Sequence, residues 1–149
     1  MTWVSHSVVT FATVFAVTNN VHAAGSAMLG STFPDRIEGP LWQFWHRSYS
    51  HWFVLYVAVL AFLWTPEMLS VNGAHLLPGG IGQTTRAFFF WFFVGALLHI
   101  PEDAVCGNVP VLYPTKRVAV LPRLFKVGSV GEFLFVIGYC AVLYLITRI

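Results

Sequence analysis

Imidazole, guanidinium and hydroxyl groups gather in one short stretch of this chain, from Trp45 to Trp52. The stretch reads Trp-His-Arg-Ser-Tyr-Ser-His-Trp and contains His46, Arg47 and His51. Charged residues make up only 9% of the chain, whereas hydrophobic residues make up 57%. Ionisable groups concentrated beside an apolar segment are candidates for function. We interpret the stretch as half of a metal site whose other half comes later in the chain.

Further candidate ligands lie on both sides of this stretch. Asp35 and Glu38 fall in a turn bracketed by proline and glycine, and His99 and Asp103 end a later apolar run. Imidazole and carboxylate ligands suit zinc or a similar divalent ion. His99 and Asp103 are four residues apart, so they share one side if a helix continues through them. For each histidine taken alone, an interfacial, hydrogen-bonded ring is the alternative.

A metal held by these groups would have a definite chemistry. It would lower the pKa of a bound water toward neutrality and so generate a nucleophile. Arg47 would hold a phosphate group through two parallel hydrogen bonds beside the metal. Such a site would bring a metal-activated water next to a bound phosphate group.

Composition indicates a single integral membrane domain covering residues 1–149. Six acidic and eight basic residues are too few to cover a soluble protein of this length, although a small domain that is nearly all core is the alternative. The net charge of +2 gives no reason to expect a nucleic-acid partner. Cys106 and Cys140 have no CxxC spacing, so no thiolate metal clamp is indicated.

Hydropathy predicts an all-α integral membrane fold with three full transmembrane helices. The expected spans are His51 to Leu69, Arg86 to Pro101 and Val130 to Thr147. Ser5 to Thr18 and Val21 to Phe33 are each too short to cross a bilayer core of about 30 Å alone. They form an N-terminal pair of short helices, either as a half-depth hairpin or as one bent crossing. The small residues at positions 23–27 would permit close helix contact.

The first apolar run has a second interpretation as a signal peptide. Val21-His22-Ala23 is a plausible cleavage site, but no Lys or Arg precedes the apolar core. We therefore expect the run to stay in the protein.

The basic residues predict how the spans are oriented. Arg36 and Arg47 precede the first span, and residues 116–126 carry four bases after the second, which brings both groups to one face. The positive-inside tendency makes this face cytoplasmic. The candidate ligands lie at the segment ends on the same face, so they can meet there.

The candidate residues also resemble the pattern of the small bacterial YdjM-like, membrane-bound metal-dependent hydrolases. That family has a histidine opening its first helix, a Pro-Asp turn, a central His-Arg motif ending in His, and a His-x-x-x-Asp motif followed by an apolar Tyr-Pro. The matching positions are His6, Pro34-Asp35 with the second acid displaced to Glu38, His46-Arg47-x-x-Ser50-His51, His99-x-x-x-Asp103 and Val109 to Pro114. The family is similar to the zinc-dependent phospholipase C and single-strand nuclease superfamily.

This resemblance implies a phospholipase C-like helical metal site that cleaves a phosphodiester or related ester. It implies catalytic roles for Asp35, for Glu38 as ligand or general base, and for Arg47 on the substrate anion. A ligand at His6 requires the half-depth hairpin, because only then does His6 reach the face of the other motifs. The implied zinc ligands are His6, Asp35, His46, His51, His99 and Asp103.

The resemblance also implies a setting. We expect the protein in the bacterial cytoplasmic membrane, with lipids as substrate or partner, and in contact with other membrane proteins or with a second copy. Two other functions stay open. A non-catalytic assembly protein would keep the fold and the metal, and a small channel or transporter subunit would spread its histidines along a water-filled path.

Overall fold

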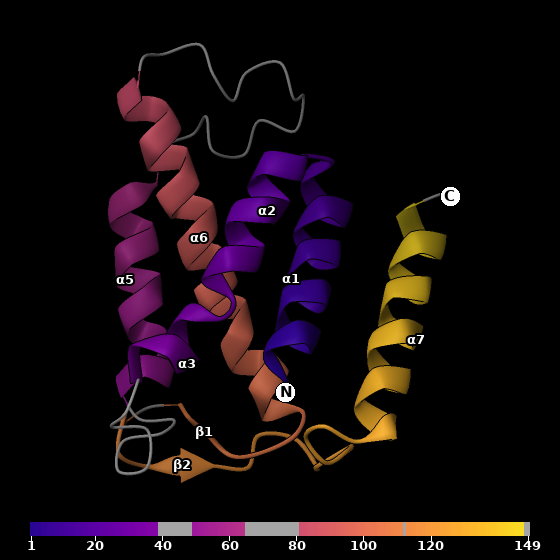
Figure 1. Ribbon diagram of the computed structural model, residues 1–149. Helices are drawn as coiled ribbons and strands as arrows, with labels where there is room; N and C mark the ends of the chain where they lie inside the picture. The colour runs from indigo at the N-terminus through magenta and orange to yellow at the C-terminus, as the bar shows by residue number, and fades with distance from the viewer. Residues whose placement is uncertain (39–48, 65–80, 112, 148–149) are drawn as a thin grey trace.

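The computed structural model describes residues 1–38, 49–64, 81–111 and 113–147, and it is mostly helical (Figure 1). Long helices run alternately up and down, and short elements close one end. The elements are α1 (Trp3–Thr18), α2 (Val21–Gly30), α3 (Phe33–Glu38), η2 (Tyr49–His51), α5 (Phe53–Leu63), α6 (Ile81–Ala104), β1 (Val109–Pro110), β2 (Arg117–Val118) and α7 (Val130–Thr147).

The N-terminal pair of short helices is an antiparallel hairpin that turns at two asparagines. Asn19 ends α1 in the left-handed conformation, with φ of 49°, and its backbone N–H bonds the carbonyl of Phe15. The Asn20 side chain then accepts hydrogen bonds from the first backbone N–H groups of α2. Both roles suit asparagine, which tolerates this backbone region and caps helices well. The hairpin brings the start of α1 and the end of α2 to the same end of the molecule (Figure 1).

Helices α2 and α6 touch backbone to backbone through two glycines. A Cβ built on Gly30 would lie 1.8 Å from the carbonyl oxygen of Phe92, and one on Gly95 would lie 1.8 Å from that of Ala27. Ala24 and Ala27 are fully buried in the same contact. The small residues that the sequence offered for close packing are therefore used, and they fix the position of α2 against α6.

Gly95→Ala is expected to lower the thermal unfolding temperature sharply. The added methyl would overlap a rigid backbone carbonyl, so α2 and α6 must separate, and overpacking of this kind costs about 1–3 kcal/mol or more. Gly25→Ala is the matched control on α2, because its Cβ would meet nothing within 4 Å. There the gain in helix propensity should leave stability unchanged or raise it by up to about 1 kcal/mol. Equal effects of the two changes would refute the close contact.

Helix α5 is shorter than the span expected over residues 51–69. It covers 11 residues, about 16 Å, and residue 64 is already extended. The Arg86 guanidinium, from the start of α6, donates to the final carbonyls of Phe62, Leu63 and Trp64. Such carbonyls have no partner within their own helix, so Arg86 caps α5 and ties it to α6. The remainder of the expected span lies outside the described residues.

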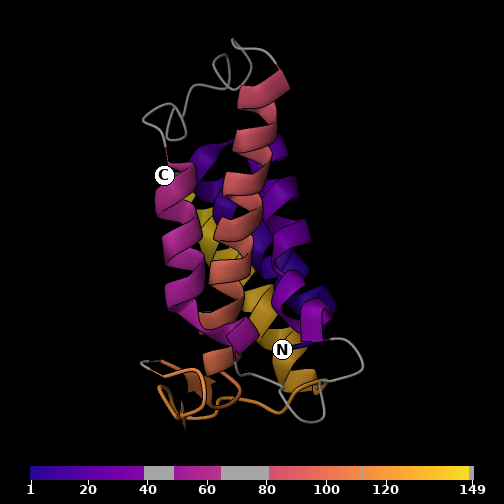
Figure 2. The same ribbon diagram turned by 90° about the vertical axis from the view of Figure 1, so that its left-hand side faces the viewer.

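Two helices in the described part of the chain are long and apolar enough to cross a membrane. They are the segment Thr84–Ala104 of α6 and the whole of α7. Helix α7 packs mainly on α1 and leaves most of its apolar surface exposed (Figures 1 and 2). Its attachment is polar: Glu132 accepts hydrogen bonds from Thr2, and Tyr139 bonds Thr13. The all-α prediction is confirmed, whereas a third full span is not shown.

The segment between α6 and α7 contains a small strand pair that the sequence did not predict. Val109 pairs with Val118, and Pro110 with Arg117, in an antiparallel ladder. Both β1 residues are buried, and both β2 residues are exposed. The pair lies at the end of the molecule that also holds α3, η2 and the first turn of α1 (Figure 1).

Candidate metal centre

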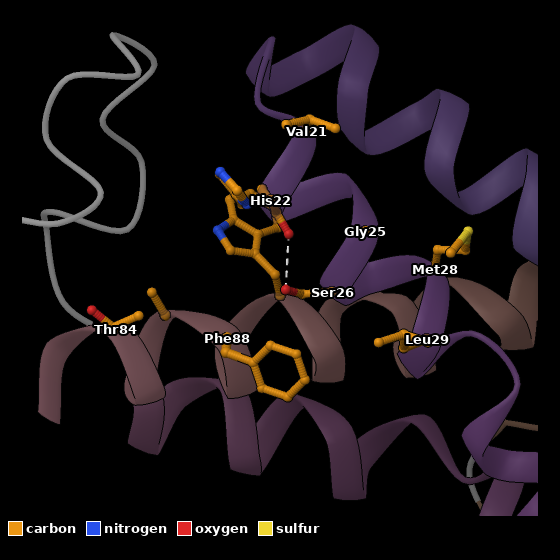
Figure 3. Close-up of a pocket in the computed structure, with 11 residues that line it drawn as sticks. Val21, His22, Gly25, Ser26, Met28, Leu29, Thr84 and Phe88 are labelled. Atoms are coloured by element: carbon orange, nitrogen blue, oxygen red, sulfur yellow. Dashed lines mark hydrogen bonds between the residues drawn. The ribbon is translucent and has the colours of Figure 1, made fainter. Parts of the chain in front are cut away.

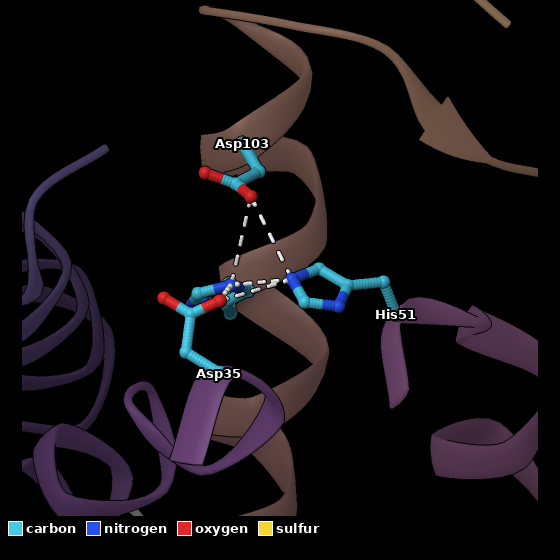
Figure 4. A group of neighbouring side chains, drawn as sticks. Asp35, His51 and Asp103 are labelled. Carbon is cyan, nitrogen blue, oxygen red and sulfur yellow. Dashed lines mark hydrogen bonds and ion pairs between the residues drawn. The ribbon is translucent and has the colours of Figure 1, made fainter. Parts of the chain in front are cut away.

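Four of the predicted site residues meet at this end of the helices. Asp35 comes from α3, His51 from η2, and His99 and Asp103 from the last turns of α6, as Figure 4 shows. One ligand atom from each lies within 4.8 Å of all the others. The two imidazoles are fully buried and Asp103 nearly so, whereas Asp35 is half-buried. The group is therefore enclosed, with its most open side at Asp35.

The distances within this group fit a tetrahedral ion site. His51 Nε2 lies 3.0 Å from His99 Nε2 and 3.3 Å from Asp35 Oδ1. The distances from Asp35 Oδ1 to His99 Nε2 and from Asp103 Oδ2 to the Nε2 atoms of both histidines are 3.6–3.7 Å. In tetrahedral zinc with bonds of about 2.0–2.1 Å, neighbouring ligand atoms are about 3.3–3.4 Å apart.

Both histidines are oriented by their other ring nitrogen. His99 Nδ1 lies 2.6 Å from the backbone carbonyl of Ser31, which can only accept, so Nδ1 carries the proton. His51 Nδ1 lies 3.1 Å from the Glu38 carboxylate, which also accepts a hydrogen bond from Ser50. In the neutral rings, the two facing Nε2 atoms then both present lone pairs at 3.0 Å. Lone pairs so close repel unless a cation or a proton lies between them. Metal-binding histidines usually have this outer hydrogen bond.

His6 approaches the group from α1, next to Asp103. Its Nε2 lies 3.3 Å from Asp103 Oδ1, and its ring stacks on that of His99 with centroids 3.9 Å apart. Its Nδ1 lies 2.5 Å from the Glu102 carboxylate, whose other oxygen accepts from Thr10. His6 Nε2 is fully buried and makes no hydrogen bond. The ring is thus aimed at the carboxylate that also faces His51 and His99.

The electrostatics outside the spanning helices follow from these contacts. Burial by itself would raise the pKa of Asp35, but the facing imidazoles of His51 and His99 outweigh it and hold the pKa well below its ordinary value. Burial would lower the pKa of His51, but Asp35 and Glu38 outweigh it and raise that pKa. Without a metal, His51 therefore binds a proton more tightly than a free imidazole does, and a bound metal would compete with that proton.

The structure brings together most, but not all, of the predicted residues. Asp35, His51, His99 and Asp103 converge, and His6 lies against them as the hairpin required. Helix α6 continues through Pro101, so His99 and Asp103 share one side as predicted. Glu38 lies behind His51, on its Nδ1 side. The other two predicted residues, His46 and Arg47, lie outside the described residues.

Glu102 is the contact that sequence reasoning missed. Glu102 is next to Asp103 in the chain, but its carboxylate forms hydrogen bonds with His6 and Thr10 of α1. One pattern in the sequence pointed to it: His6 and Thr10 are polar, four residues apart and on one face of a largely apolar helix. A polar pair of this kind needs a buried partner.

Glu38→Gln is expected to weaken metal binding by about 10–100-fold, the usual cost of losing an outer partner of a ligand. The amide keeps the size of the side chain but removes the charge that orients and polarises His51. Titration with zinc in competition with a chelating dye measures the change. Glu132→Gln is the control, since this buried glutamate bonds Thr2 and Gly128 instead. Equal affinities of wild type and Glu38→Gln would contradict the role of Glu38.

An apolar groove lies elsewhere, along α2 and the first half of α6 (Figure 3). It has a volume of about 580 Å³ and is bordered by His22, Met28 and Phe88, among others. The metal-ligand group lies at the other end of α6, so the groove does not form part of it.

Comparisons of the chain with protein-family models, with curated proteins and with solved structures found no match. The function of this protein is therefore inferred from the arrangement of the ligand residues.

Proposed function

We propose that this protein is a membrane-bound metal-dependent hydrolase of the YdjM-like kind, with zinc held by Asp35, His51, His99 and Asp103. The observation that carries the proposal is the convergence of these buried ligands with both histidines oriented through Nδ1. Paired histidines and carboxylates form the donor set of a zinc site. Bound zinc would supply a water of near-neutral pKa and a Lewis acid for the substrate oxygen.

The side chains around the metal would have separate roles in binding substrate and in holding the ligands. Asp35 borders the open side of the group, so substrate would enter past it. Glu38 would keep His51 oriented by accepting a hydrogen bond from its Nδ1–H, which makes the ring a stronger ligand. His6, held by Glu102, would extend the ligand set beyond Asp103 toward a second ion. Arg47 would bind the substrate anion, and His46 would join the ligands.

We further propose that the substrate is a lipid phosphodiester or a related lipid ester. The ligand group lies at the end of α6, one of the two helices long enough to span a bilayer. In the proposed membrane setting this end of the helix would lie at headgroup depth. The proposed setting is the cytoplasmic face of a bacterial inner membrane, with residues 51–69 as a third membrane-crossing segment.

The test is hydrolysis of a panel of phospholipids in mixed micelles by the purified, zinc-loaded protein. We expect a metal-dependent product, detected by mass spectrometry, that disappears after chelation and returns with zinc. Arg47→Ala should raise KM more than it lowers kcat, because Arg47 is proposed to bind the anion. A zinc-loaded protein that cleaves no member of the panel would overturn the proposed reaction.

A structural metal site in an assembly protein is the second candidate. Its supporting observation is the near-complete burial of three of the four ligands, since structural zinc sites are closed whereas catalytic sites keep a position open. The two candidates differ in whether a small anion reaches the metal. In a cobalt-substituted protein, cyanide should change the visible spectrum if the site is open and should have no effect if it is closed.

A further inference from the structure

The segment 113–127, between β1 and α7, is basic without a single acidic residue. Its four cationic side chains are all exposed: Lys116, Arg117, Arg123 and Lys126. Large apolar side chains alternate with them along the chain and are also 42–61% exposed. They are Tyr113, Val118, Val120, Leu121, Leu124 and Val127. We call this set of side chains the basic-apolar surface.

No exposed acidic group in the described part of the chain offsets this charge. Its five acids are all buried or half-buried, at the ligand group, on His6 or on the attachment of α7 to α1. The remaining acid, Glu67, lies outside the described residues. The exposed charge at this end of the molecule is therefore positive.

The basic-apolar surface is fixed against the end of α6. Leu124 donates its backbone N–H to the carbonyl of Val105, and Arg123 Nε donates to the carbonyl of Cys106. Phe125 packs on Phe135 of α7, with ring centroids 5.1 Å apart. The surface is thus anchored at Val105 and Cys106, two and three residues after Asp103, at the end of the molecule that holds the metal ligands (Figure 1).

The placement of this surface follows from the helices on either side of it. Helices α6 and α7 are the two candidate spans, and they run in opposite directions (Figure 1). A segment that joins two antiparallel spans emerges at one membrane–water interface. Exposed valine and leucine side chains are unfavourable in water but stable at the boundary between headgroups and acyl chains.

We propose that the basic-apolar surface binds anionic phospholipid, with its cations on the headgroups and its apolar side chains inserted among the upper acyl carbons. Cationic side chains near an anionic leaflet attract it, and apolar insertion adds to this attraction. Lys116 already lies over the ring of Tyr113, at 5.5 Å, a pairing of cation and aromatic suited to the interface. A nucleic acid would meet the cations but leave the apolar side chains unburied.

This inference rests on the membrane placement proposed above, and it does not depend on the metal. Its consequence is that anionic lipids would collect beside the ligand group, so the lipid class that the site meets first would be anionic.

The test uses the full-length protein purified in a neutral detergent, titrated with phosphatidylglycerol or phosphatidylcholine and analysed by native mass spectrometry. Wild type should retain phosphatidylglycerol in clear preference. The variant K116Q/R117Q/K126Q should lose this preference by about fivefold for each cation removed. Arg123 is left in place because it bonds the Cys106 carbonyl. The charge-retaining variant K116R/R117K/K126R is the control and should bind as wild type does.

The basic residues also help to direct membrane insertion. Lipid binding is therefore measured on the purified protein, where insertion no longer affects the result. Equal retention of the two lipids by wild type, unchanged retention by the neutral variant, or stronger binding of a DNA oligonucleotide would each overturn the proposal. If the neutral variant does not fold, the salt dependence of wild type is the test. The affinity of wild type for phosphatidylglycerol must decrease as salt is raised from about 0.1 M to about 1 M, because the Debye length shortens from about 10 Å to about 3 Å. Zinc content measured on the same samples reports separately on the metal centre.

Discussion

Replacing His99 with alanine is expected to abolish stoichiometric metal binding. His99 Nε2 is within 3.7 Å of ligand atoms from each of the other three residues in the group, so it lies at the centre of the ligand set. Without it, the three remaining ligands leave one side of the ion open. The loss should exceed the 10–100-fold cost of removing an outer partner, because a direct bond to the metal disappears. Elemental analysis of the purified variant measures the metal content directly.

His22→Ala is the matched control for this substitution. His22 is exposed on α2, beside the apolar groove and away from the ligand group. Its replacement should leave one equivalent of metal in place. Circular dichroism of both variants shows whether the helices remain. A folded His99→Ala protein that still binds a full equivalent of zinc would contradict the assignment of His99.

Removing the metal is expected to lower the thermal unfolding temperature of the wild-type protein by roughly 10 °C. A ligand present at about 1,000 times its dissociation constant stabilises the folded state by about 4 kcal/mol, and in a chain of this length each kcal/mol corresponds to about 2–4 °C. The structural cause is that bound zinc would hold the buried imidazoles and carboxylates together through direct bonds, and a proton on His51 replaces these bonds only in part. Differential scanning fluorimetry with and without a strong chelator measures the shift.

The same chelator should have no effect on His99→Ala, which binds no metal to lose. This comparison separates loss of the metal from any direct action of the chelator on the protein or detergent. An equal shift in both proteins, or no shift in wild type, would show that the metal does not stabilise this fold.

Sequence reasoning predicted the parts of the site that depend on local spacing. His99 and Asp103 are four residues apart, and a continuing helix places them on one side whatever the rest of the fold does. The two asparagines at positions 19 and 20 allowed a turn there, and the structure uses them for a hairpin. The hairpin brings His6 to Asp103, which was predicted only through the resemblance.

Contacts made across the fold could not be predicted in this way. The orientation of His99 depends on the carbonyl of Ser31, a backbone group with no signature in the sequence. The pairing of Glu102 with α1 required the packing of α1 on α6, which periodicity alone does not give. Gly30 and Gly95 were visible as small residues, but only their opposed carbonyls show that α2 and α6 meet there.

The most direct test of the central claim is X-ray absorption at the zinc edge of the purified, zinc-loaded protein. The structure predicts a first shell of nitrogen and oxygen only, at about 2.0–2.1 Å, with the outer scattering of two imidazole rings. His99→Ala should lose this spectrum. A first shell containing sulfur at about 2.3 Å, or a protein that takes up no zinc, would contradict the assignment of Asp35, His51, His99 and Asp103 as a metal centre.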